Sequence, residues 1–306
     1  MPPILLIDQS NLAMRAFYGT FRPGRPLLAS SRGFPTNCIS TWSGMVEGLV
    51  RHMAPQRLIF VIDGKPQRRL QLHPAYKVGR PDKPVALQQQ LPVLHQLIRD
   101  SGLEYCYEEA EEADDLIAAL AHQFEGVAPV SIVSADKDFS QCVTERVTRL
   151  VPGPGGGWGR LGEAEIVAEY GVRPNQFAQY LALVGDDADN IPGIDLIGPG
   201  KAAKILAGEP SIDLIIERVA TLKRWTRDEA AASFQRSYTL TRAIDVGEVT
   251  VRRGANLPAA LAKLDELECR KAARVLQALR DWRGPLGPVV AAQREAVAPG
   301  EQQELF

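Results

Sequence analysis

The chain has 306 residues, of which 45% are hydrophobic and 24% charged, and its formal net charge is −2. This is the composition of an ordinary globular protein with one large or two smaller domains, and the charge alone points to no partner. The apolar run before Asp8 is only four residues long, which excludes a signal peptide or membrane span at this position, and we expect a cytoplasmic protein. Four widely spaced cysteines argue against a zinc site or a disulfide framework: Cys38, Cys106, Cys142 and Cys269.

Short apolar runs alternate with amphipathic segments in the first half of the chain. The runs predict strands, and the segments between them predict helices. Strands are expected at 4–7, 58–62, 104–107, 130–135 and 147–151, and helices at about 38–53, 84–100 and 114–124. Because strands of this kind alternate with helices, the sequence predicts an α/β fold with a mostly parallel sheet covered on both faces.

The pattern changes to helices alone from about residue 174. We therefore expect an α/β core over 1–173, with a hairpin or loop at GPGGGWG (153–159), and an all-helical domain over 174–283. From residue 284 to 306 the chain has few apolar residues and repeated proline and glycine, so a disordered tail is expected there.

Carboxylates follow the predicted strands at the point where each strand ends. Asp8, Asp63 and Asp136 come directly after strands, and the run EEAEEADD (108–115) follows another. Asp is common in such turns, and an acidic run is typical of a helix start, so each one alone has an ordinary explanation. In parallel sheets, however, ligands bind beyond the carboxyl ends of the strands, and four acidic groups at one edge favour a site.

Two further acidic pairs extend this cluster. Asp136 and Asp138 alternate along the chain, and Asp186 and Asp189 in GDDADN lie three residues apart. Many oxygen ligands together suit hard divalent cations such as Mg²⁺ or Mn²⁺, and paired ions are the usual device for phosphodiester hydrolysis.

The acidic run can contribute to this site only if a helix begins inside it. In one continuous helix, Asp114 would lie about 160° from Glu112 around the axis. We therefore place the strand-to-helix turn within 108–115, so that Glu112, Asp114 and Asp115 face the sheet edge. The remaining three acids are then solvated or capping residues.

The segment 65–83, called the basic segment below, has the opposite charge. It holds six basic residues against one acid, a net charge of +5: Lys65, Arg68, Arg69, Lys77, Arg80 and Lys83. A solvated basic loop is the ordinary interpretation. Its position directly after Asp63 instead favours binding of a phosphate backbone at the mouth of the acidic site.

A second anion-binding feature occurs in IPGIDLIGPGKAAKIL (191–206). A Gly-Pro-Gly turn precedes a predicted helix whose first turn carries Lys201. Backbone N–H groups at such a turn can bind an anion, although similar turns are widespread.

Taken together, EEADDLIA, VSADKDF, AYKVGR and LVGDDADNIPGIDLIGPGKAAKIL resemble motifs of the bacterial and phage 5′-nuclease family over residues 3–282. This family includes the 5′→3′ exonuclease domain of DNA polymerase I and, more distantly, the flap endonucleases. The resemblance implies a PIN-like two-metal nuclease core, an arch at about 65–90, and a helix-hairpin DNA-binding domain. One departure is Gln9-Ser10-Asn11 after the first Asp, where glycine is common, but it removes no ligand.

The resemblance also implies roles for individual residues. Ligands of the first metal are expected at Asp8, Asp63 and Glu112, and ligands of the second at Asp136, Asp138, Asp186 and Asp189, with Asp114 and Asp115 between them. Arg15, Lys77 and Arg80 match residues that steer and polarise the scissile phosphate. Main-chain carbonyls at Leu183, Val184, Pro192, Ile194 and Ile197 match a monovalent-cation site, expected for K⁺. DNA contacts are expected at Arg68, Arg69, Tyr76, Leu196, Ile197, Gly198, Pro199, Gly200 and Lys201.

The expected function is a Mg²⁺-dependent, structure-specific 5′ nuclease that uses two ions, for which Mn²⁺ can substitute. Its expected substrates are DNA flaps, nicks and 5′ ends, with primer RNA as a further candidate, and we expect a monomer. Two rivals stay open. One is a PIN-type ribonuclease, which the long helical second domain disfavours. The other is a DNA-junction binding protein with a vestigial metal site, which the complete acid set disfavours.

The chain ends in QQELF (302–306), which resembles the bacterial sliding-clamp-binding pentapeptide Gln-x-x-Leu-Phe at Gln302, Leu305 and Phe306. A random polar terminus is the ordinary interpretation. The polar linker before it and the two large apolar side chains favour a peptide that binds the sliding clamp.

Overall fold

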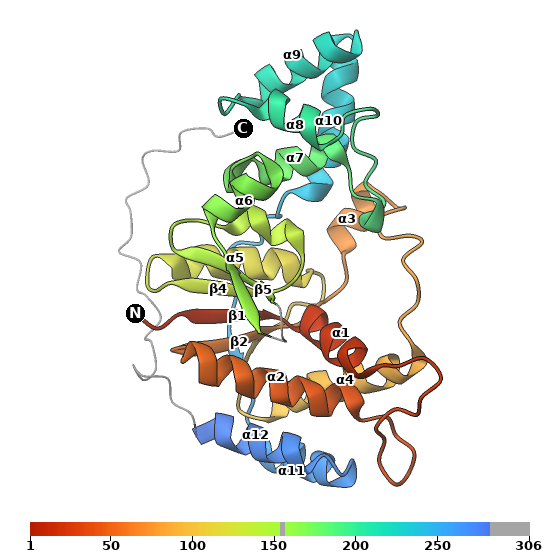
Figure 1. The fold of residues 1–306 in the computed structure, drawn as a ribbon, viewed down its shortest axis with the longest axis vertical. Coiled ribbons are helices and arrows are strands. Elements are labelled where there is room, and N and C mark those ends of the chain that lie inside the picture. The colour runs from red at the N-terminus through yellow and green to blue at the C-terminus, as the bar shows by residue number, and fades with distance from the viewer. Residues whose placement is uncertain (154–156, 282–306) are drawn as a thin grey trace.

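A seven-stranded sheet runs through the lower half of the protein (Figure 1), for which the computed structural model describes residues 1–153 and 157–281. The strand order is β6-β5-β4-β1-β2-β3-β7. The five central strands are parallel, and only the two edge strands, β6 and β7, are antiparallel to their neighbours. The strands are β1 Ile4–Asp8, β2 Arg57–Val61, β3 Glu104–Cys106, β4 Val130–Val133, β5 Val147–Pro152, β6 Trp158–Leu161 and β7 Arg252–Arg253.

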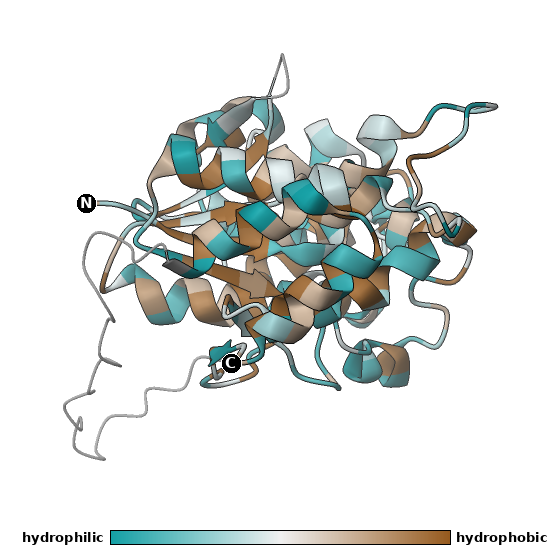
Figure 2. Ribbon diagram, turned by 90° about the horizontal axis from the view of Figure 1, so that it is seen from below, coloured by the Kyte–Doolittle hydropathy of each residue, from teal (hydrophilic) through white to brown (hydrophobic). Residues whose placement is uncertain are grey.

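Helices cover both faces of this sheet because its central strands are apolar on both sides. In β1, Leu5 and Ile7 join one core cluster and Ile4 and Leu6 join the other. The first face packs against α1 Gln9–Thr20, α2 Asn37–Met53 and α4 Val85–Asp100, and the second against α5 Ala113–Glu125. Figure 2 shows the brown strands enclosed by helices that carry hydrophilic residues on their outer sides. The predicted mostly parallel α/β fold is confirmed.

A helical unit lies beside the sheet at the top of Figure 1. It has its own core, formed around Phe177, Leu181 and Phe234. Its helices are α6 Glu163–Tyr170, α7 Phe177–Val184, α8 Pro199–Leu206, α9 Ile212–Lys223 and α10 Arg227–Thr241. This helical unit begins before residue 174, because α6 contributes Ile166 to its core.

The last part of the expected helical domain over 174–283 belongs to the sheet core instead. After α10 the chain returns to pair β7 with β3, and α11 Leu257–Glu266 and α12 Arg270–Asp281 pack into the core cluster of α2 and α4. This corrects the expected boundary. The physical reason is that an amphipathic pattern shows that a helix face is buried but does not say against which partner.

The basic segment connects β2 to α4 and crosses to the helical unit. It contains α3 Gln67–Leu72 and then a series of turns. The amide of Lys77 donates to the carbonyl of Asp189, and the side chain of Asn190 donates to the carbonyl of Ala75. Main-chain contacts thus tie this arch-like segment to the loop that carries Asp186 and Asp189.

Other expectations concern the hairpin, membrane segments and the tail. The expected hairpin or loop at 153–159 overlaps the start of β6, which runs antiparallel to β5, and residues 154–156 lie outside the described part. No helix within the described ranges is both long and apolar enough to cross a membrane. The expected tail over 284–306, with Gln302, Leu305 and Phe306, lies outside the described residues.

Candidate active site

The carboxyl ends of the parallel strands hold the first group of acids. Asp8 ends β1 and caps α1, where its Oδ1 accepts from the Asn11 amide at 3.0 Å, and its Oδ2 accepts from Ser134 Oγ at 2.8 Å. Asp63 follows β2, and its Oδ1 accepts from the Ala113 amide at 3.0 Å. Asp136 follows β4 and caps the 3₁₀-helix η1 Lys137–Cys142 through the Asp138 amide. The three carboxylates thus lie at the carboxyl ends of the neighbouring strands β4, β1 and β2.

The acidic run turns from extended chain into helix inside the expected window. Glu112 is the extended residue before α5, so that Asp114 and Asp115 lie in the first helical turn. Asp63 bonds to the start of the same helix, which brings Glu112, Asp114 and Asp115 to the sheet edge.

Asp186 and Asp189 reach the site from a tight loop after α7. Asp186 caps the 3₁₀-helix η4 Asp187–Asp189. The loop closes by a bridge between Asp186 and Ile191, and glycines allow this closure. Gly193 has φ +63°, and a Cβ on it would lie 2.4 Å from the Gly185 nitrogen, so no larger residue fits there without movement of the backbone.

Basic side chains neutralise the acids at this edge. Lys77 pairs with Glu112, and Arg80 pairs with Asp189. Lys137 Nζ lies 2.5 Å from Asp186 Oδ2. The two basic-segment residues expected to act on the scissile phosphate therefore lie among the expected metal ligands, where a phosphate bound to the ions would meet them.

Two residues expected to contact DNA are buried in this charge network. Arg69 is 5% exposed and pairs with both Asp115 and Glu112, while Tyr76 is 4% exposed and its hydroxyl donates to Asp189 at 3.2 Å. Neither side chain is free on the surface to bind a phosphate. The physical reason is that clustered buried carboxylates need counter-charge, which the nearest arginine supplies.

Burial and mutual repulsion raise the pKa of several acids. Burial, followed by the nearby charge of Asp63, raises the pKa of Asp8 to about 7. Burial and the charge of Asp136 raise the pKa of Asp138 to about 7, and burial also raises the pKa of Asp114 well above its usual value. The cluster is therefore under-neutralised in spite of its basic neighbours, and a bound cation would stabilise the ionised forms.

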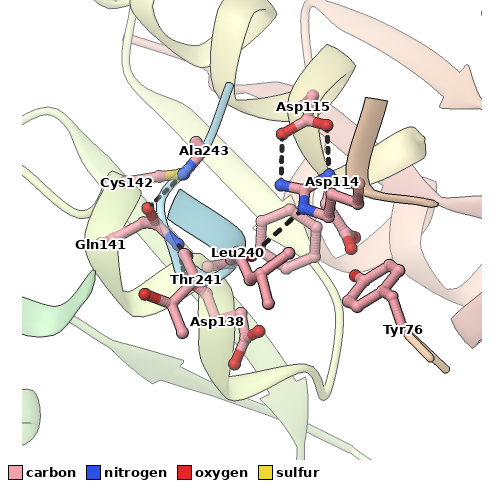
Figure 3. A pocket seen from close by; sticks show the side chains of 11 residues that line it. Tyr76, Asp114, Asp115, Asp138, Gln141, Cys142, Leu240, Thr241 and Ala243 are labelled. Carbon is pink, nitrogen blue, oxygen red and sulfur yellow. Dashed lines mark hydrogen bonds and ion pairs between the residues drawn. The ribbon is translucent and has the colours of Figure 1, made fainter. Parts of the chain in front are cut away.

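A small cavity lies between the acids of α5 and η1 (Figure 3). Asp114 and Tyr76 line it on one side and Gln141 and Thr241 on the other, with Asp138 between the two sides. Its volume of about 20 Å³ has room for one water-sized species. Asp138 Oδ1 is buried there without a hydrogen-bond partner. Lys137 Nζ lies 3.8 Å from this oxygen, and a carboxylate oxygen without a hydrogen bond beside a void of this size fits a cation in donor type and charge.

A ready-made ligand cage is not present. Within residues 1–153 and 157–281, no three His, Cys, Asp or Glu side chains converge closely enough to hold an ion as they stand. The acids point instead to the basic side chains, as Glu112 does to Lys77 and Asp186 to Lys137. Metal binding at this edge therefore requires these side chains to turn away from the carboxylates.

Arg15 lies away from the acids, although it was expected at the phosphate. Its guanidinium lies 4.7 Å from the centre of the Trp158 ring, and its Nη1 is buried without a hydrogen-bond partner. It lines a separate groove with residues of α2. The resemblance implied the phosphate role, whereas Arg15 lies about two turns along α1 from Asp8.

The turn expected to bind an anion and the carbonyls expected to bind a monovalent cation lie together in the helical unit. Leu196 has φ +64° and is 73% exposed, and Lys201 Nζ donates to its carbonyl at 2.9 Å. The carbonyls of Leu183 and Ile194 accept amides of Ile194 and Ile197, which brings the proposed carbonyl ligands close together. The Gly198–Gly200 turn then opens α8.

Three residues that sequence reasoning did not assign also organise the site. The Ser134 hydroxyl donates a hydrogen bond to Asp8, and Asn11 Oδ1 accepts one from the Ala135 amide at 3.0 Å. Lys137 forms an ion pair with Asp186. Lys137 could have been found, because a lysine between two acids of a cluster is a natural counter-charge. Ser134 and Asn11 carry no comparable signal, since Ser and Asn are common in turns.

Comparison with known proteins identifies the relatives of this chain. Residues 3–171 match the family described as 5′–3′ exonuclease, N-terminal resolvase-like domain, and residues 172–273 match 5′–3′ exonuclease, C-terminal SAM fold. A 5′–3′ exonuclease of Aquifex aeolicus is 31% identical over 278 residues, which cover 88% of this chain and 93% of the relative. The thermostable DNA polymerase I of Thermus aquaticus is 32% identical over 233 residues, 75% of this chain but only 27% of the polymerase.

Solved structures share the fold. The T5 D15 protein co-crystallised with metal ions has a TM-score of 0.63 at 18% identity and covers 91% of this chain and all of its own. Flap endonuclease-1 from Methanococcus jannaschii has a TM-score of 0.56 at 14% identity, with 91% and 93% covered. With both halves of the family pattern matched in order and the strand-edge acids in place, the chain belongs to the 5′–3′ exonuclease family.

Proposed function

We propose that the protein is a divalent-metal-dependent, structure-specific 5′ nuclease that hydrolyses DNA phosphodiesters in replication or repair. The observation that carries this proposal is the acid cluster at the sheet edge, with Lys77 and Arg80 among the acids. The names of its relatives, which include exonucleases and flap endonucleases, support the same activity.

Two Mg²⁺ ions are the proposed cofactors, with Mn²⁺ as a substitute. The proposed ligands are Asp8, Asp63 and Glu112 for one ion and Asp136, Asp138, Asp186 and Asp189 for the other, with Asp114 and Asp115 between them. Bound cations of this kind lower the pKa of an attacking water and neutralise charge on the leaving 3′ oxygen. Structural neighbours crystallised with metal ions support a metal-dependent reaction.

The basic residues of the site have two proposed roles in turn. Without substrate, Lys77 and Arg80 neutralise Glu112 and Asp189. If cations bound the carboxylates, the two side chains would be free to bind the equatorial oxygens of the scissile phosphate, whose charge grows in the transition state. Arg69 and Tyr76 stay buried and hold the acids in place.

The helical unit is proposed to hold the DNA duplex. The amides of the Gly198–Gly200 turn and Lys201 offer an anion site at the start of α8, and Arg68 on the basic segment adds an exposed cation. A K⁺ ion on the carbonyls of Leu183, Val184, Pro192, Ile194 and Ile197 would support this contact. Neighbours solved with DNA support a nucleic-acid substrate.

The test is incubation with 5′-labelled flap, nicked and blunt duplexes in Mg²⁺, beside RNA and single-stranded controls. We expect short labelled products from the flap and nicked DNA that disappear with EDTA and return with Mn²⁺. Replacing K⁺ by Na⁺ at constant ionic strength should raise the KM for duplex substrates and leave single-stranded ones unchanged. Absence of cleavage of every DNA substrate in both metals would contradict the proposal.

A further proposed partner is the sliding clamp, through Gln302, Leu305 and Phe306. This proposal rests on the sequence pattern alone. Short unfolded peptides bind modestly, but attachment to a ring around DNA raises the local concentration of an enzyme at its substrate. Titration of the full chain against the clamp of its own organism should show an affinity that truncation after Gly300 abolishes. Equal binding by both forms would reject the proposal.

A further inference from the structure

A buried arginine lies behind the acids proposed to bind the second ion. Arg149 is a residue of β5 and is only 2% exposed. It pairs in register with Ile132 of β4, on the face of the sheet that α5 covers. On that face, Ile132 beside it and Val147 two residues before it both belong to the apolar core. A permanent cation therefore occupies a position where an apolar side chain is the rule.

The guanidinium of Arg149 spans the stretch that carries Asp136 and Asp138. Its Nη2 donates to the carbonyl of Ala135, the residue before Asp136, at 3.5 Å. Its Nη1 donates to Ser140 Oγ, two residues after Asp138, at 2.7 Å, and Ser140 is itself fully buried. The guanidinium is thus attached just before the first of these acids and just after the second.

These contacts leave the charge of Arg149 without a direct partner. Its Nε is buried without a hydrogen bond, and no carboxylate of the described residues forms an ion pair with it. Burial lowers the pKa of Arg149, and the charges of Tyr170, Asp136, Glu169 and Asp138 oppose that shift. Arginine stays protonated all the same, because its ordinary pKa is far above neutral.

Asp136 and Asp138 are the groups that compensate this charge best. Burial raises the pKa of Tyr170 to about 12, so its ring carries no charge near neutral pH. Glu169 is exposed on α6, where water screens its charge. The two aspartates are partly buried and adjoin the residues that Arg149 contacts, so the interaction with them is screened less.

Arg149 differs from the other cations near these acids because it cannot turn away. The side chains of Lys137 and Arg80 are 40% and 48% exposed, so both can move into water when a cation approaches the carboxylates they pair with. Arg149 has no such access to water, and contacts on both sides of the acids hold it. Its charge therefore stays beside any ion that Asp136 and Asp138 bind, and a fixed like charge weakens the binding of that ion.

We propose that Arg149 is a fixed internal counter-charge that lowers the affinity of Asp136 and Asp138 for a divalent cation. This inference rests on the proposed metal-dependent function. Arg149 touches neither the ion nor the substrate and acts through the two aspartates. It favours their ionised forms before an ion binds, and it makes the bound ion easier to release than the same acids alone would.

Neutral replacements in the full-length protein test the proposal. Arg149→Met removes the charge at similar length, Arg149→Gln also keeps a donor for Ser140, and Arg149→Lys keeps the charge. Each is made in an Asp63→Asn background, which removes a proposed ligand of the first ion. Binding of Mn²⁺ is measured from the electron paramagnetic resonance signal of the free ion at about pH 8.5, where carboxylates with a pKa of about 7 are ionised.

The expected change is opposite to that of structural damage. Arg149→Met and Arg149→Gln should bind Mn²⁺ at least about tenfold more tightly than the parent, and Arg149→Lys should stay within about threefold of it. The difference should persist at high salt, because a buried charge is screened little. Loss of a merely structural contact would displace the acids and weaken Mn²⁺ binding instead.

The matched control is Arg146→Met, at an exposed arginine directly before β5. It lies at the end of the strand away from the acids and should change Mn²⁺ affinity less than about twofold. Circular dichroism confirms that each variant is folded. Unchanged or weaker Mn²⁺ binding in the folded neutral variants, or equal tightening in Arg149→Lys, would overturn the proposal.

The outcomes also separate this inference from the proposed nuclease activity. If wild type cleaves DNA in Mg²⁺ but the neutral variants bind Mn²⁺ no more tightly, only the role of Arg149 is rejected. If the neutral variants bind Mn²⁺ more tightly but wild type cleaves no DNA in either metal, the nuclease proposal fails and the role of Arg149 stands.

Discussion

Arg69 holds Asp115 by two parallel contacts, 2.5 Å from Nη1 to Oδ2 and 2.8 Å from Nη2 to Oδ1, with both side chains almost fully buried. The same guanidinium reaches Glu112 and the carbonyl of Leu240. One side chain of the basic segment therefore fixes α5, the acid cluster and the end of α10 together. The basic segment, which the sequence predicted to bind a phosphate backbone, therefore includes one of the most buried charges among the described residues.

The first prediction concerns the stability that depends on this pair. Arg69→Met removes the one side chain that, among the residues the structure describes, pairs with both Asp115 and Glu112, so we expect the free energy of unfolding to fall by about 3 kcal/mol. The control is Arg68→Met, which breaks a half-exposed pair with Glu111 and should cost less than about 1 kcal/mol. Urea denaturation in EDTA measures the free energy of unfolding of both variants. Similar losses for Arg69→Met and Arg68→Met would contradict the prediction that the buried pair stabilises the fold more than the half-exposed one.

The second prediction separates catalysis from binding. Asp63→Ala and Asp138→Ala should lower single-turnover cleavage by at least about a thousandfold, since each removes a proposed metal ligand. Asp63→Asn should be as inactive, although its amide oxygen can still accept from the Ala113 amide. DNA affinity in EDTA should stay within about threefold of wild type, because the proposed phosphate contacts are elsewhere. Near-normal turnover of Asp63→Asn would reject the site.

The third prediction concerns Lys77. Its proposed role is greatest in the transition state, so Lys77→Ala should slow the single-turnover chemical step by about a hundredfold and weaken DNA binding much less. Lys83→Ala is the matched control, an exposed lysine of the same basic segment, and should affect binding only. If Lys77→Ala changed affinity alone and left the single-turnover rate intact, Lys77 would be a docking residue.

The fourth prediction is a pH dependence of stability without metal. Because the pKa of Asp8 is about 7 in the folded chain against 3.8 for the free group, the folded state binds more protons between these values. Its contribution to stability therefore falls as pH rises from about 4 to about 7 and is constant above. The Asp8→Asn side chain cannot ionise. In EDTA, the melting temperature of this variant minus that of wild type should therefore increase as the pH rises from about 4 to about 7. Mg²⁺ should reduce the gain by stabilising the wild-type carboxylate. If the melting temperatures of Asp8→Asn and wild type differed by the same amount at every pH from 4 to 8, this prediction would be wrong.

The sequence by itself predicted the five parallel strands, a mostly parallel sheet and the edge at which the acids are expected to gather, but not the strand order or the two antiparallel edge strands β6 and β7. The predicted features depend on local patterns: apolar runs that end in Asp8, Asp63 and Asp136, and an acidic run in which a helix must begin near Glu112. Parallel strands send their carboxyl ends to one side, so position along the chain was enough to place these side chains together.

Only the tertiary structure decided the partners of the charges and of the last helices. Arg15 faces Trp158 instead of the acids, Arg69 is buried against Asp115, and α12 packs on α2. Each of these contacts joins residues tens to hundreds of positions apart. A pattern of charge or hydrophobicity says that a side chain needs a partner of a given kind, but many partners of that kind exist in the chain. The folded geometry selects one because burial of unpaired charge and exposure of apolar surface must be avoided everywhere at once.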